Sequence, residues 1–190
     1  RAMTLQKRMH DHVIFIGPDC WKDKENPFFK EDVSLFADWK QSAANEGLGV
    51  KVGRWDIPGQ PIAFMVDFRA HESEKNKIYG QLWEDFKVDS LHAYGDYDDS
   101  ALFAYATALV VESFYKYYLN ASQRVVFHAN EWQTGFALLL LQKRVPQIAS
   151  VFTTHATCIG RSIAGNNKPL YEYLWVYNGD QMAAELNMQS

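Results

Sequence analysis

Hydrophobic residues recur along the chain with two spacings, one typical of strands and one typical of helices. Short apolar runs closed by glycine or proline indicate strands, whereas apolar positions three and four residues apart indicate helices. The spacings predict strands at residues 12–16, 50–55, 62–66, 125–128 and 148–153. They predict helices over residues 3–9, 32–45, 74–86, 99–119 and 131–143. The pattern also predicts a polar loop over 19–30, and loop with short helices after His155.

The order of these elements predicts the fold class. A turn sequence, Pro58-Gly59-Gln60-Pro61, separates strands 50–55 and 62–66, so these strands are expected to form a hairpin. In the second half, the order is helix, strand, helix, strand, and the strands are continuously apolar. Such strands are typical of a buried parallel sheet covered on both faces. We therefore expect an α/β, Rossmann-like fold with a mainly parallel sheet flanked by helices.

Two segments leave the ends of predicted strands and are candidates for function. In open α/β sheets, the ligand crevice lies beyond the carboxyl ends of the strands, which selects residues 128–132 and 153–161. In the first segment, Asn130 and Glu131 stand at a helix start, where free N–H groups and a partial positive charge are available. Helix capping by Asn130 explains the same residue types without any ligand.

The second segment contains a histidine and an arginine after a run of hydroxyl residues. His155 could donate a hydrogen bond to a substrate hydroxyl, and Arg161 could bind a phosphate or a carboxylate. A hydroxyl-rich turn with a structurally bonded histidine is the alternative interpretation, and the sequence leaves both open.

Composition excludes several function classes. The chain has 190 residues and a net charge of -4 with no basic run, which argues against nucleic-acid binding. Its longest apolar stretch, 136–141, is far shorter than the roughly 20 residues that span a bilayer. Cys20 and Cys158 stand far apart, so they predict neither a metal site nor a disulfide framework and fit a reducing compartment.

A polar cluster precedes the long helix at 99–119. Its members are His92, Tyr94, Asp96, Asp98 and Asp99. Carboxylates could bind Mg²⁺ or Ca²⁺, but this spacing matches no known ion-binding loop. We expect a solvated cap region, in which Asp98 or Asp99 caps the helix.

Several stretches together resemble one family, the glycogen synthases, chiefly the eukaryotic-type enzymes and their bacterial relatives. Residues 125–135 read Val-Val-Phe-His-Ala-Asn-Glu-Trp-Gln-Thr-Gly and are similar to the family's strand followed by His-Glu-Trp-x-x-Gly. Residues 152–161 resemble its Phe-Thr-Thr-His-Ala-Thr-x-x-Gly-Arg segment very closely. Residues 15–18 and 53–55 match two further family stretches. The resemblance covers essentially the whole chain.

The resemblance implies a retaining glycosyltransferase of the GT-B type, in which two Rossmann-like domains face each other across a cleft. Such an enzyme transfers glucose from a nucleotide sugar to the non-reducing end of an α-1,4-glucan, without a cofactor or a metal. UDP-glucose is the favoured donor, because the match is to the eukaryotic-type branch. The implied partners are this donor and an α-glucan acceptor, with no nucleic acid and no membrane; a homo-oligomer stays open. The implied location is cytoplasmic.

The resemblance also implies how much of such an enzyme the chain contains. Residues 1–190 would be a single, incomplete N-terminal, acceptor-side domain, without the donor-binding domain, and would be inactive alone. The start at Arg1 and the helical pattern of residues 184–190 also suggest a piece of a longer chain. The family's Lys-x-Gly-Gly loop is expected upstream, together with a strand from the middle of the sheet.

The resemblance assigns roles to the candidate site. The residues are Asn130 and Glu131 at the glucose hydroxyls, Thr154 and His155 on the same wall, Trp132 shaping the pocket, and Arg161 near the acceptor or the domain interface. One departure concerns Asn130, which replaces the family histidine. An asparagine can donate and accept hydrogen bonds but carries no proton charge near neutral pH.

Three alternatives to the UDP-glucose enzyme remain open. The first is another GT-B transferase, such as an ADP-glucose-dependent starch or glycogen synthase. The second is a carbohydrate-binding or regulatory pseudoenzyme, which the loss of the histidine would favour. A plain α/β domain that has merely inherited the motifs is the third and least specific interpretation.

Overall fold

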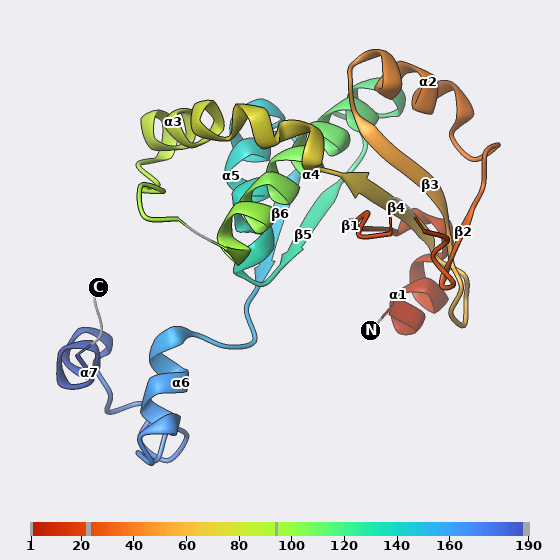
Figure 1. Cartoon of the computed structure of the whole chain (residues 1–190). Coiled ribbons are helices and arrows are strands. Elements are labelled where there is room, and N and C mark those ends of the chain that lie inside the picture. Colours follow the sequence, from red (N-terminus) through yellow and green to blue (C-terminus); the bar gives the residue numbers. More distant parts are fainter. Residues whose placement is uncertain (1, 22–23, 94, 188–190) are drawn as a thin grey trace.

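The computed structural model describes residues 2–21, 24–93 and 95–187 and has the α/β class that the sequence predicts, with parallel strands flanked by helices (Figure 1). The helices, with η marking 3₁₀ helices, are α1 (Ala2–Met9), η1 (His10–His12), α2 (Ala37–Asn45), η2 (Arg69–Glu74), α3 (Lys75–Phe86), α4 (Asp96–Tyr118), η3 (Trp132–Thr134), α5 (Gly135–Arg144), α6 (Cys158–Gly165) and α7 (Gly179–Glu185). The strands are β1 (Ile14–Pro18), β2 (Phe29–Glu31), β3 (Gly49–Trp55), β4 (Ile62–Asp67), β5 (Val126–Asn130) and β6 (Ala149–Thr153).

The strands of the described residues form two separate groups. A four-stranded sheet has the order β1-β4-β3-β2, and β5 pairs with β6. Strands β1 and β4 are parallel, as are β5 and β6, whereas β3 is antiparallel to both of its neighbours. The predicted hairpin of β3 and β4 is confirmed. The further central strand implied by the resemblance stays a prediction.

Helix α4 packs between the two groups of strands and is buried on nearly all sides. Ala106 and Val110 pack in one core cluster with Trp39 and Phe64, while other positions of α4, including Leu102, pack in a second cluster that contains residues of α3 and α5. A helix that is apolar all round belongs inside a protein rather than on its surface. The long apolar helix predicted for this region is therefore confirmed, and it lies across the two groups of strands (Figure 1).

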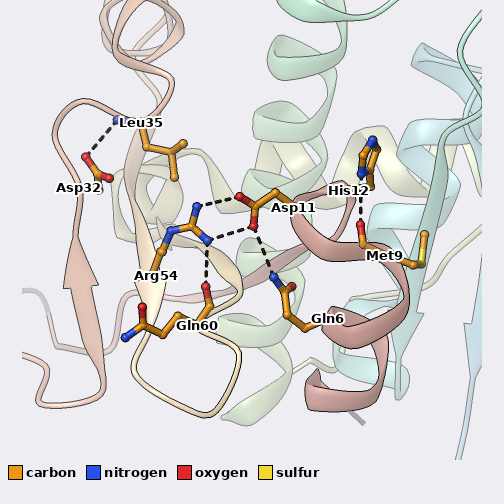
Figure 2. Close-up of polar contacts among 8 residues, drawn as sticks. All are labelled: Gln6, Met9, Asp11, His12, Asp32, Leu35, Arg54 and Gln60. Carbon is orange, nitrogen blue, oxygen red and sulfur yellow. Dashed lines mark hydrogen bonds and ion pairs between the residues drawn. The ribbon is translucent and has the colours of Figure 1, made fainter.

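Three predicted boundaries and caps were wrong. The helix expected from residue 32 begins at Ala37, because the Asp32 carboxylate accepts hydrogen bonds from the backbone N–H groups of Ser34 and Leu35. Figure 2 shows the bond from Leu35. Such local bonds offer the backbone an alternative to helix. Helix α4 begins after Gly95, not after an aspartate cap. The loop expected over residues 19–30 contains the start of β2.

The predicted burial of β5 and β6 was also wrong. Val126 is 60% exposed, and Val151 and Phe152 are 43% and 49% exposed. The physical reason is the position of α6 and α7, which pack on one another and lie away from both groups of strands (Figure 1). Val126 and Val151 lie on one face of the β5–β6 pair and Phe152 lies on the other, so both faces are partly uncovered in the described residues.

The segment at residues 53–55 has a structural explanation. A Cβ atom on Gly53 would lie 2.2 Å from the carbonyl oxygen of Lys30, so only glycine allows β2 to approach β3. The neighbouring Arg54 donates to both carboxylate oxygens of Asp11, at 3.0 and 2.8 Å, and to the carbonyl oxygen of Gln60 (Figure 2). The hydrogen bond from Arg54 is the main cause of the lowered pKa of Asp11. Because Arg54 pairs with Ile62 at the start of β4, this network lies at the opposite end of the sheet from the carboxyl end of β4.

Candidate functional site

Strands β5 and β6 bring the two predicted segments to one edge. Their parallel register pairs Asn130 with Thr153, so the loops that follow both strands leave the same end of the pair. Asn130 and His155 are exposed there, and Glu131 is half-buried. The prediction that two strand-end loops converge is confirmed, because hydrogen bonds join Glu131 of one loop to residues of the other.

Glu131 fastens the two loops together with both its backbone and its side chain. Its N–H donates to the carbonyl oxygen of Thr153 at 2.8 Å, and its Oε1 accepts the N–H of His155 at 2.6 Å. Its Oε2 lies 3.4 Å from Oγ1 of Thr154, but that hydroxyl has one proton and is closer, at 2.9 Å, to the carbonyl oxygen of Ala156. The bond to the His155 N–H is therefore the main side-chain contact, and a charged acceptor makes it a strong one.

The backbone of Glu131 is strained. Its φ of 63° and ψ of 168° fall in a region that almost only glycine occupies, at a cost of about 1–3 kcal/mol for other residues. Glycine would relieve this cost but would bring no carboxylate. The presence of glutamate at this turn indicates that its side chain has a task, and the contact with His155 is the one that the structure shows.

Asn130 does not cap the helix that follows it, so that prediction was wrong. A 3₁₀ turn, η3, comes first, and α5 begins at Gly135. The hydroxyl of Thr134 instead lies 2.9 Å from the carbonyl oxygen of Asn130 and 3.1 Å from that of Glu131, and its one proton can be donated to either. Capping therefore does not explain an asparagine at this position.

A contact of His128 was missed by sequence reasoning. Its Nε2 lies 2.7 Å from Oγ1 of Thr153, across the β5–β6 pair. His128 and Asn130 are two residues apart on one strand, so they share a face. The alternation of the strand could have placed His128 beside Asn130. The contact with Thr153 depends on the register with β6, in which Thr153 is opposite Asn130 and lies diagonally from His128.

Trp132 turns toward the start of α4. Its ring stacks on that of Tyr97, with centroids 6.4 Å apart and an interplanar angle of 19°, and 49% of the residue is exposed. The two residues line a cavity of about 440 Å³ together with residues before α4. Asn130, Glu131, Thr154, His155 and Arg161 do not line it.

The polar cluster at the start of α4 is only partly a solvated cap, because His92, Asp96 and Asp99 are exposed but Asp98 is held by α3. Asp98 accepts from Nζ of Lys75 at 2.7 Å and from the hydroxyl of Tyr79 at 2.6 Å, so it joins α3 to α4. These bonds, first that of Lys75, lower the pKa of Asp98. Burial and the bond to Asp98 raise the pKa of Tyr79. Tyr94 lies outside the described residues, among which no group of His, Cys, Asp or Glu side chains could hold a metal ion.

Arg161 lies on α6, beyond the loop that contains Thr154 and His155. Thr157 caps this helix, its Oγ1 accepting the N–H of Gly160 at 3.1 Å. A Cβ on Gly160 would lie 3.0 Å from this oxygen. Part of the 152–161 segment therefore serves to start a helix, which places Arg161 on a separate element from the other predicted site residues.

Comparison with known proteins matches the model of one family, described as glycogen synthase, to residues 1–189. The chain belongs to the glycogen synthase family. It is 27% identical over 97% of its length to a glycogen (starch) synthase of Caenorhabditis elegans. It is 32% identical over 73% of its length to the liver glycogen (starch) synthase of Homo sapiens, and 29% identical over 73% to a glycogen (starch) synthase of Dictyostelium discoideum. The chain spans 28%, 20% and 15% of the lengths of these three relatives.

Membership of the glycogen synthase family confirms the resemblance read from residues 125–135 and 152–161. The structure adds that these two stretches meet through Glu131. No helix among the described residues is both long enough and apolar enough to cross a membrane. Both cysteines are free and exposed, and the cytoplasmic location stays a prediction.

Proposed function

We propose that the protein containing this chain is a glycosyltransferase that moves glucose from a nucleotide sugar to the non-reducing end of an α-1,4-glucan. The observation that supports this proposal most is the family match over residues 1–189. The structure agrees with it, because the two stretches most similar to the family contact each other at one sheet edge. We propose UDP-glucose as the donor and retention of the anomeric configuration. In this proposal, the chain contributes the acceptor-side domain of a GT-B fold and does not transfer glucose alone.

In this reaction, the main role of the two loops would be to position the sugar. A retaining transfer develops positive charge at the anomeric carbon while the nucleotide diphosphate leaves, and fixed polar groups stabilise such a transition state. Asn130, exposed at the end of β5, would bind glucose hydroxyls through its side-chain amide, which donates and accepts. His155 would complete the same wall from the second loop.

Glu131 would act chiefly as a positioning residue in this scheme. Its Oε1 already holds the N–H of His155, so it fixes the distance between the loops. A carboxylate has about four lone-pair sites, so Glu131 could also accept a glucose hydroxyl. Arg161 would lie farther out, toward the acceptor or a second domain.

The full-length protein tests this proposal. It would be incubated with glycogen and either UDP-[¹⁴C]glucose or ADP-[¹⁴C]glucose, and label in precipitated glucan would be counted. We expect label from UDP-glucose, in a product that an α-1,4-specific exo-glucosidase releases completely. Label from ADP-glucose alone would assign the protein to the ADP-glucose-dependent transferases.

A second candidate is a carbohydrate-binding or regulatory pseudoenzyme, which one observation favours: Asn130 stands where the resemblance has a histidine. The variant Asn130→His separates the two. Glucan binding without transfer in the wild-type protein, with transfer gained in the variant, would favour the pseudoenzyme. Transfer by the wild-type protein would exclude it.

A further inference from the structure

His128 makes a short contact across the β5–β6 pair, directly beside the candidate site. Its Nε2 lies 2.7 Å from Oγ1 of Thr153, although His128 itself is exposed. Asn130 lies on the same face as His128, because alternate residues of a strand point to one side. Thr153 is directly opposite Asn130 in the register and diagonal to His128. The Thr153 hydroxyl therefore has two polar side chains beside it, and it bonds to His128.

This contact decides whether the Asn130 side chain is available to a ligand. In the part of the chain that the structure describes, no hydrogen bond reaches the Asn130 side-chain amide, which is exposed and offers both a donor and an acceptor. Directly opposite residues on paired strands have Cβ atoms about 4.5–5.5 Å apart, so the hydroxyl of Thr153 is within reach of that amide. Because the hydroxyl bonds to His128 instead, the amide keeps its full hydrogen-bonding capacity.

Removal of the imidazole would change the partner of the Thr153 hydroxyl. The side chain of a β-branched residue has few χ1 rotamers, so the hydroxyl has few places to turn. Without His128, the amide of Asn130 directly opposite becomes its cross-strand partner. A ligand would then have to break this internal bond before it could bind Asn130. The net contribution of one such bond corresponds to about a two- to tenfold change in affinity.

We propose that His128 is a positioning residue, which holds the Thr153 hydroxyl and so keeps the Asn130 amide available to bind a sugar hydroxyl. The sugar and its transfer rest on the proposed function, whereas the competition of His128 and Asn130 for one hydroxyl rests on the geometry of the strand pair. His128 acts in this scheme without touching the sugar. Its effect therefore depends on the hydroxyl of Thr153, and this dependence distinguishes it from a residue that only supports the strand.

Kinetics of the full-length protein test this dependence with a double variant. His128→Ala should raise the KM for UDP-glucose about two- to tenfold with little change in kcat, because the lost contact is one of binding. Thr153→Val removes the hydroxyl and keeps the branched shape, so its addition to His128→Ala should recover most of that loss. His128→Gln, whose amide can still bond to a hydroxyl, should retain a KM near that of the wild type.

The matched control is Val126→Ala, because Val126 is 60% exposed and lies on the same face of β5 as His128. Its KM and kcat should equal those of the wild type. A double variant with the same raised KM as His128→Ala would overturn the inference, because the loss would then be independent of the Thr153 hydroxyl.

A crystal structure of the full-length His128→Ala protein separates this inference from the proposed function. We expect the Thr153 hydroxyl within hydrogen-bonding distance of the Asn130 amide in this variant. The measurement needs no transfer, so it applies even if the protein transfers no glucose. A Thr153 hydroxyl that stays away from Asn130 would overturn the inference, even if the wild type transfers glucose from UDP-glucose normally. If His128→Ala fails to fold by circular dichroism, His128→Val keeps a good strand former at this position and decides the outcome.

Discussion

Glu131 offers the sharpest perturbation of the candidate site, because its backbone and its side chain make opposite contributions to stability. The carboxylate accepts the His155 N–H at 2.6 Å, and a hydrogen bond to a charged group contributes about 1.5–3 kcal/mol. The backbone at φ 63° and ψ 168° costs about 1–3 kcal/mol for any residue except glycine. Substitutions that change one contribution without the other can therefore separate them.

Three variants at this position are expected to rank differently in stability and in activity. Glu131→Ala loses the carboxylate and keeps the strain, so its free energy of unfolding should fall by about 1.5–3 kcal/mol, near the lower value because the site is half-exposed. Glu131→Gly also loses the carboxylate, but it relieves the backbone strain. Part of that gain, about 0.5–1 kcal/mol, is offset by the larger conformational entropy that glycine loses on folding. It should therefore be more stable than the alanine variant by about 0.5–2 kcal/mol. Glu131→Gln keeps an acceptor without the charge and should be intermediate.

Activity should not follow this order. If the carboxylate positions the His155 loop, the alanine and glycine variants should lose most transfer alike, although glycine is the more stable. Urea unfolding followed by circular dichroism measures stability, and incorporation of labelled glucose by the full-length protein measures transfer. A glycine variant with full activity would refute the positioning role. An alanine variant as stable as the glycine variant would refute the argument from strain.

The remaining predictions concern the structure that supports the site. Gly53→Ala should detach β2 from β3, because its Cβ would lie 2.2 Å from the carbonyl oxygen of Lys30; amide hydrogen exchange of residues 29–31 should then accelerate, and unchanged protection would contradict this. Asp98 has a pKa lowered mainly by Lys75, so its contribution to stability is present at neutral pH and is lost as the pH falls from about 4 through the folded-state pKa. The urea midpoint of Asp98→Asn should accordingly lie below that of the wild type at pH 7, and the gap should narrow as the pH falls below about 4. A constant gap would argue against the ion pair. Leu82 is 1% exposed, so Leu82→Ala should lower the free energy of unfolding by about 2–5 kcal/mol. A loss below about 1 kcal/mol would show that the second core cluster is loosely packed.

Local patterns were sufficient to predict much of the fold. Apolar runs and helical spacing located the hairpin of β3 and β4, helix α4 and the last two strands, since each depends on nearby residues. Strand β2 was missed because three residues at a sheet edge carry no periodic pattern, and its pairing depends on a glycine in another strand. The exposure of β5 and β6 was missed because burial depends on where α6 and α7 lie, which spacing does not encode.

For the site, the sequence predicted which loops meet but not how they are joined. The rule for parallel strands was enough to place Asn130 and His155 at one edge. The bond from the His155 N–H to the Glu131 carboxylate depends on backbone torsions at the turn, and the side-chain contact of His128 with Thr153 depends on register. Neither is visible in residue order.

In the function proposed here, the loops after β5 and β6 form one wall of a sugar pocket. A crystal structure of the full-length protein with UDP-glucose and a maltooligosaccharide measures this directly. We expect a glucosyl ring within hydrogen-bonding distance of both Asn130 and the 153–155 loop. A sugar bound with neither loop in contact, while the enzyme is competent for transfer, would contradict it.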